Sequence, residues 1–128
     1  MNISMLDLKA EYTQIKNEID EAVKAVLESG HFILGPNVAY FEGEFAEYIG
    51  TRFSIGVASG TDALFLALKA LGIKGGDEVI TTALSFIATA EAISYTGARP
   101  VFVDVDPVTH NIDPQKIEKA ITKKTKAI

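Results

Sequence analysis

Residues 78–105 read EVITTALSFIATAEAISYTGARPVFVDV, and this stretch decides the fold of the chain. Two apolar runs, Glu78–Thr82 and residues 100–105, are rich in β-branched residues and predict strands. Between them, residues 85–96 predict a helix that Gly97 ends, because glycine adopts a left-handed cap at little cost. A helical connection between two buried strands makes those strands parallel. The stretch therefore predicts an α/β domain.

The same alternation extends to both sides of this unit. Further short apolar runs at residues 53–58 and 125–128 predict two more strands. Residues 61–71 and 114–121 predict helices, the second with Asp113 as its N-cap. We therefore expect mainly parallel strands joined by right-handed crossovers.

The first fifty residues follow a helical period instead. Gly30 and Gly50 each follow an apolar pattern with spacings of three and four, so we expect a helix to end at each glycine. The two patterns are Leu8, Tyr12, Ile15, Ile19, Val23, Val26 and Leu27, and Val38, Phe41, Phe45 and Tyr48. We expect an N-terminal helical segment over residues 1–50 and the first part of an α/β domain over residues 51–128.

Composition and charge narrow the class of protein. The chain has 128 residues, 48% of them hydrophobic, and a formal net charge of −5. Its lack of cysteine excludes disulfides, thiolate zinc sites and cysteine nucleophiles. An acidic chain without a basic stripe argues against nucleic acid. The longest uncharged stretch, residues 29–41, is too short to span a membrane, and no secretory signal is recognisable. We expect a cytoplasmic protein that binds a small molecule.

The segment Ser59-Gly60-Thr61-Asp62 stands where a predicted strand meets a predicted helix. The first amides of a helix have no internal acceptors, and the helix dipole adds positive potential there. Gly60 allows close approach of an anion, and the hydroxyls of Ser59 and Thr61 can donate to it, so a phosphate suits the site. The alternative is that Ser59 or Asp62 only caps the helix.

Phe86 follows the predicted strand Glu78–Thr82, at the sheet edge where open α/β folds bind ligands. In the first turn of the next helix its ring would cover a flat ligand, or it would belong to the core. Asp104 and Asp106 could ligate a metal, but Asp106-Pro107 is also an ordinary turn opener, so we expect a turn and no metal site.

Taken together, the sequence resembles the start of the DegT/StrS family of sugar aminotransferases, in the aspartate aminotransferase superfamily of fold type I. The resemblance covers almost the whole chain. The matching stretches are Gly35-Pro36 with Phe41-Glu42, Ser59-Gly60-Thr61-Asp62-Ala63-Leu64, Gly76-Asp77-Glu78-Val79-Ile80, residues 86–93 (FIATAEAI) and residues 97–106 (GARPVFVDVD).

The resemblance implies pyridoxal 5'-phosphate as cofactor. Gly60 and Thr61, with Ser59 beside them, match positions that hold the cofactor phosphate, and Phe86 matches the aromatic that stacks on the pyridine ring. Phe32 lies in a loop that resembles a segment near the sugar-nucleotide substrate. The implied reaction transfers an amino group from an amino acid, most often glutamate, to a nucleotide-linked keto-sugar in polysaccharide biosynthesis. A homodimer is also implied.

Two residues of the family's chemistry are expected beyond Ile128: the Schiff-base lysine and the aspartate that pairs with the pyridine nitrogen. The run at residues 125–128 looks like the start of a strand, so we expect a fragment of a longer protein. The polypeptide 1–128 alone is then expected to be inactive. A sugar dehydratase with histidine in place of the lysine, a regulatory protein and a generic phosphate-binding domain remain alternatives.

The resemblance also bears on strand order. In the superfamily, residues 78–82 and 100–105 form adjacent parallel strands, whereas residues 53–58 do not neighbour residues 78–82. The simplest interpretation of the sequence would instead place all strands side by side in chain order.

Overall fold

The computed structural model describes residues 5–128. The chain divides into two compact units, the first ending at Gly56 and the second running from Val57 to Ile128. Each unit has its own secondary structure. The domain boundary expected after residue 50 stays a prediction.

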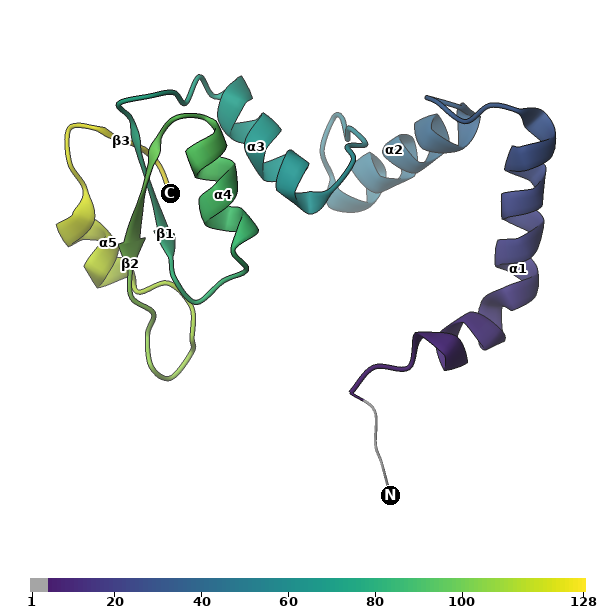
Figure 1. The fold of residues 1–128 in the computed structure, drawn as a ribbon, viewed down its shortest axis with the longest axis horizontal. Helices are drawn as coiled ribbons and strands as arrows, with labels where there is room; N and C mark the ends of the chain where they lie inside the picture. The colour runs from purple at the N-terminus through teal and green to yellow at the C-terminus, as the bar shows by residue number, and fades with distance from the viewer. Residues whose placement is uncertain (1–4) are drawn as a thin grey trace. The chain divides into compact units, whose positions relative to one another are not determined.

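The first unit consists of two helices, α1 (Leu8–Ser29) and α2 (Pro36–Ile49) (Figure 1). An Asp7 carboxylate oxygen accepts the Ala10 N–H at 3.0 Å and so caps the start of α1. Gly30 ends α1 with φ 68°, and Gly50 ends α2 with φ 76°. Both predicted helix ends are therefore confirmed.

The second unit is built on a parallel three-stranded sheet in the order β2-β1-β3. Its strands are β1 (Glu78–Thr82), β2 (Arg99–Val103) and β3 (Thr125–Ala127). Its helices are α3 (Gly60–Ala70), α4 (Ala88–Tyr95) and α5 (Pro114–Ala120). The predicted class, α/β with parallel strands, is confirmed.

Strand pairing confirms one expectation and corrects another. β1 and β2 pair in parallel from Glu78 opposite Arg99 to Thr82 opposite Val103, as expected. However, β3 pairs with the other edge of β1, so placing the strands in chain order is wrong. The physical reason is burial: β1 is buried at its first three residues and takes the centre, whereas β2 exposes Arg99 and Phe102.

The strand expected over residues 53–58 is wrong, because the structure forms no strand there. The described strands pair only with one another, so this segment has no strand beside it. Its backbone is held differently: the Gly56 N–H donates to a Glu42 carboxylate oxygen of α2 at 2.6 Å. Phe53 is 76% exposed, which shows that its run of apolar residues is not buried as a strand here.

The core of the second unit lies where the helices meet the sheet. α4 packs against α3, β1 and β2, and Figure 1 shows α3 and α4 next to each other. The core cluster consists of the buried residues Ile73, Val79, Ile93 and Ala98, with Leu68 and Ala127 packed against it. This core joins Ile93, in the second half of α4, to Val79 near the start of β1.

Candidate functional site

The start of α3 has an ordinary cap. Ser59 is extended, at φ −162° and ψ 167°, and its hydroxyl accepts the Asp62 N–H at 3.1 Å. Its carbonyl accepts the Ala63 N–H at 3.0 Å. Ser59 therefore caps the helix, and because its hydroxyl only accepts there, its O–H can still donate, so its expected contact with a phosphate stays a prediction.

Capping by Ser59 leaves part of this helix start free. Within residues 5–128, neither the amides of Gly60 and Thr61 nor the Thr61 hydroxyl has a hydrogen-bond partner. A Cβ built at Gly60 would meet no atom within 4 Å, so the space beside its Cα is open. Two free amides, a free hydroxyl and the positive end of the helix dipole fit a phosphate group.

Phe86 lies in the loop that joins β1 to α4. It was expected in the first turn of the helix, but α4 begins at Ala88, so that expectation is wrong. The reason is that residues 83–87 are needed to turn the chain from the end of the strand. The Phe86 side chain is 78% exposed and does not belong to the core of this unit. Its ring is available to cover a ligand.

A hollow of about 270 Å³ lies beside Phe86. It combines two aromatic rings with three hydroxyl side chains, and it opens where β1 ends. The lining residues are Thr82, Ala83, Ser85, Phe86, Ile87, Thr89, Ala90 and Phe102. Such a lining suits a flat ring that carries polar substituents.

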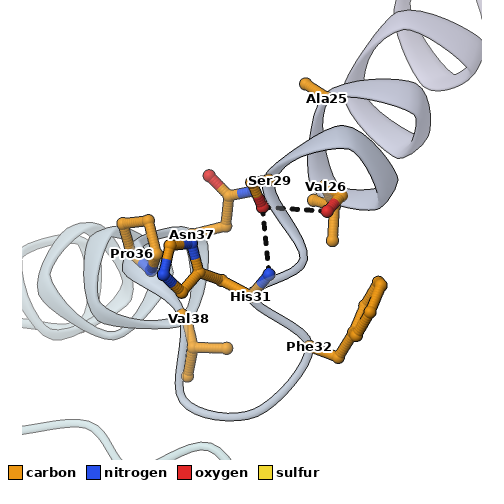
Figure 2. A pocket seen from close by; sticks show the side chains of 9 residues that line it. Ala25, Val26, Ser29, His31, Phe32, Pro36, Asn37 and Val38 are labelled. Carbon is orange, nitrogen blue, oxygen red and sulfur yellow. Dashed lines mark hydrogen bonds between the residues drawn. The ribbon is translucent and has the colours of Figure 1, made fainter.

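Phe32 belongs to the first unit, in the loop between α1 and α2. Figure 2 shows the His31 ring beside Pro36 and Asn37, while the Phe32 ring points away from them. The His31 N–H donates to the Ser29 hydroxyl at 3.2 Å, and this hydroxyl donates to the Val26 carbonyl at 2.8 Å (Figure 2). Phe32 is 66% exposed and lines a mainly apolar hollow at the end of α1.

Asp106 opens a turn after β2. Asp106 accepts the N–H groups of Val108 and Thr109 at 3.0 and 2.7 Å, and the Thr109 bond is the main reason that its pKa is lowered. The pKa of Asp104 is lowered chiefly by the Val105 N–H and then by Lys116. No group of metal-binding side chains occurs within residues 5–128. The turn expected at Asp106-Pro107 is confirmed, whereas Asp104 lies before it and pairs with Lys116.

Two features of the second unit escaped the sequence reasoning. One is the buried carboxylate of Glu78, which joins Arg99 and Thr122. The other is a hydrogen bond between the hydroxyls of Ser85 and Thr89, whose spacing of four residues was the available sequence signal. Over the part of the chain that the structure describes, no helix is long and apolar enough to cross a membrane.

The fold defines an α/β protein with a parallel sheet, in which the start of α3 and the hollow beside Phe86 are separate features, since no residue of α3 lines that hollow. Residues 13–128 match the DegT/DnrJ/EryC1/StrS aminotransferase family. The chain belongs to this family, as its resemblance predicted.

Two curated relatives illustrate the match. The chain is 52% identical over its full length to a pleiotropic regulatory protein of Geobacillus stearothermophilus, of which it covers 34%. It is 48% identical, over 98% of its length, to the UDP-2-acetamido-2-deoxy-3-oxo-D-glucuronate aminotransferase of Pseudomonas aeruginosa, of which it covers 35%. The chain thus spans about a third of these relatives.

Solved structures agree with the family. DesV of Streptomyces venezuelae matches 97% of the chain at 48% identity with a TM-score of 0.94, and the chain covers 33% of it. NtdA of Bacillus subtilis, crystallised with bound cofactor PMP, matches 88% at 43% identity with a TM-score of 0.86, and the chain covers 26% of it. The fold described above is therefore the one that these two structures have over 33% and 26% of their own length.

Proposed function

We propose that residues 1–128 belong to a pyridoxal-phosphate-dependent aminotransferase. Its substrates would be an amino acid, with glutamate as the expected donor, and a nucleotide-linked keto-sugar. The observation that carries the proposal is the open start of α3, where the Gly60 and Thr61 amides and the Thr61 hydroxyl have no partner within residues 5–128. Family membership and the aminotransferase names of the relatives support the choice of reaction.

In this proposal each part of the site has a separate task. The amides of Gly60 and Thr61 and the Thr61 hydroxyl bind the cofactor phosphate, while Ser59 keeps the first turn of α3 closed through its bond to the Asp62 N–H. Phe86 covers one face of the pyridine ring, because its ring is exposed beside a hollow with hydroxyl side chains. The cofactor, when bound, supplies the electron sink for amino transfer.

The remaining catalytic groups would come from outside residues 1–128. These groups would be the Schiff-base lysine and the aspartate that pairs with the pyridine nitrogen. Phe32 would approach the sugar-nucleotide, which its exposed position in the loop after α1 supports.

The proposal also includes a homodimer in the cytoplasm. Apolar side chains on α1 and in the loop after it, among them Val23, Leu27 and Ile33, are exposed within residues 5–128, which supports a surface that the rest of the protein or a second subunit covers. The acidic composition and the lack of cysteine support a cytoplasmic location.

A regulatory role is the second candidate, and the name of the Geobacillus stearothermophilus relative favours it. A sugar dehydratase of the same family is a third. Residues 1–128 do not distinguish the dehydratase from the aminotransferase. The proposal places the lysine or histidine that does so outside these residues.

Titration of the whole protein with pyridoxal phosphate tests the proposal. We expect saturable binding, a visible absorbance band of the protein-bound cofactor, and conversion of the cofactor to its amino form when glutamate is added. Binding without conversion by any amino acid would favour the dehydratase or the regulator. No binding at all would reject the assignment.

A further inference from the structure

The loop over residues 83–87, which carries Phe86, is restrained at both ends by hydroxyl groups. At its start, the Leu84 N–H donates to the Thr82 hydroxyl at 3.2 Å. At its end, the hydroxyls of Ser85 and Thr89 form a hydrogen bond at 3.1 Å. These are the side-chain hydrogen bonds that hold the turn from β1 to α4.

Thr89 forms hydrogen bonds with Phe86 and with Ser85, the residue before it. Its N–H donates to the Phe86 carbonyl at 3.1 Å, while its hydroxyl is bonded to Ser85. Thr89 itself is fixed, because it belongs to the first turn of α4, where Ala88 and Ala92 are buried. The hydroxyl pair therefore connects the loop to a helix anchored in the core.

The exposed Phe86 ring depends on this backbone for its orientation. A buried ring is oriented by the side chains packed around it, but Phe86 is 78% exposed. Its direction is set by the conformation of Ser85 and Phe86, which the bond to Thr89 restrains.

We propose that Ser85 and Thr89 are positioning residues, whose hydroxyl pair sets the loop conformation that lays the Phe86 ring over the pyridine ring of the cofactor. This inference rests on the proposed function. Neither hydroxyl contacts the cofactor in this proposal, although both side chains line the hollow beside Phe86. Restraint of a loop before binding lowers the entropy cost of ordering it.

The test uses the whole protein with Ser85→Ala, Thr89→Val and both together, each also in a Phe86→Ala background. The readouts are the dissociation constant of pyridoxal phosphate and the visible circular dichroism of the bound cofactor, which reports its orientation. Each single variant is expected to weaken binding roughly threefold to tenfold, the range for one hydrogen bond. The double variant should match the single variants, because both remove the same bond.

The background and the controls separate positioning from other roles. In the Phe86→Ala background the Ser85 and Thr89 substitutions should have no further effect, since they act through the ring. Ser85→Thr should keep wild-type binding. Ser94→Ala, which removes an exposed hydroxyl that bonds only within α4, should change neither readout.

Three outcomes would overturn the inference. Unchanged binding and dichroism in Ser85→Ala and Thr89→Val would reject it and leave the proposed function intact. Losses that add in the double variant, or that persist without Phe86, would assign the hydroxyls to direct cofactor contact or to stability. Failure of the wild-type protein to bind pyridoxal phosphate would reject both proposals together.

Discussion

The Arg99 guanidinium donates to a carboxylate oxygen of Glu78 at 2.6 Å, and these two residues begin the adjacent parallel strands β2 and β1. Glu78 is only 4% exposed. Its other carboxylate oxygen accepts the Thr122 hydroxyl at 2.7 Å, just before β3. One carboxylate thus joins the starts of all three strands, and it fixes the sheet whose opposite end carries the Phe86 loop.

Replacement of Glu78 by glutamine is expected to lower the free energy of unfolding. The amide keeps the size of the side chain but removes the charge that Arg99 and Thr122 bind, and it brings two extra N–H donors into a buried place. Urea unfolding of the whole protein measures the effect. Glu118→Gln, on the exposed side of α5, is the matched control and should unfold like the wild type.

The same carboxylate predicts a dependence of stability on pH. The Thr122 hydroxyl, followed by Arg99, holds the pKa of Glu78 below its ordinary value of 4.5. Because the folded state binds this proton less readily than the unfolded state, the stabilisation is complete above pH 4.5 and is lost as the pH falls through the folded pKa. Asp104 and Asp106, whose pKa values are also lowered, act in the same direction.

Urea midpoints measured from neutral pH to below 4.5 check this dependence. The Glu78→Gln protein should lose less stability over that interval than the wild type, since one of the titrating groups is gone. Equal slopes in the two proteins would show that the Glu78 contact contributes nothing to the acid response.

Thr61→Val tests the proposed phosphate site, because valine keeps the branched shape and removes only the hydroxyl. Loss of a hydrogen bond to a charged group costs about 1–3 kcal/mol, so cofactor binding should weaken by this amount. Thr13→Val removes an exposed hydroxyl from α1 and serves as control. If both variants bind the cofactor like the wild type, Thr61 is only a residue of the helix start.

Gly35 lies where an added Cβ would collide with backbone. A Cβ at Gly35 would lie 2.9 Å from the His31 carbonyl oxygen, and the preceding Leu34 already has φ 48°. Gly35→Ala should therefore distort the turn that carries Phe32 and cost about 1–3 kcal/mol of stability. Gly43→Ala in α2 meets no neighbour and should instead stabilise the helix by about 0.5–1 kcal/mol. Thermal unfolding of the pair distinguishes the two signs.

Local patterns in the sequence predicted most of the fold. The β-branched runs predicted β1 and β2, and the glycines at 30, 50 and 97 predicted helix ends. Each of these features depends only on residues close by in the sequence. Residues 53–58 misled for the same reason: an apolar run indicates a strand only where a neighbouring strand can pair with it.

The candidate site was predictable to a similar extent. The free amides of Gly60 and Thr61 follow from their place at a helix start, which the sequence gives directly. The contact of Glu78 with Thr122 joins residues 44 positions apart, and no local pattern announces such a pair. The length of the Phe86 loop was also missed, because Ser85 bonds to the helix without belonging to it.

The lysine that anchors the cofactor covalently is expected outside residues 1–128. None of the lysines in residues 1–128 lies in a stretch that resembles the family's Schiff-base lysine. Borohydride reduction of the whole protein with pyridoxal phosphate, followed by peptide mapping, should therefore place the modified lysine outside residues 1–128. The polypeptide 1–128 alone should transfer no amino group, because the proposed site at Gly60, Thr61 and Phe86 contains no amine to accept and return a proton. A specifically modified lysine within residues 1–128 would mean that the chemistry is arranged differently from the proposal.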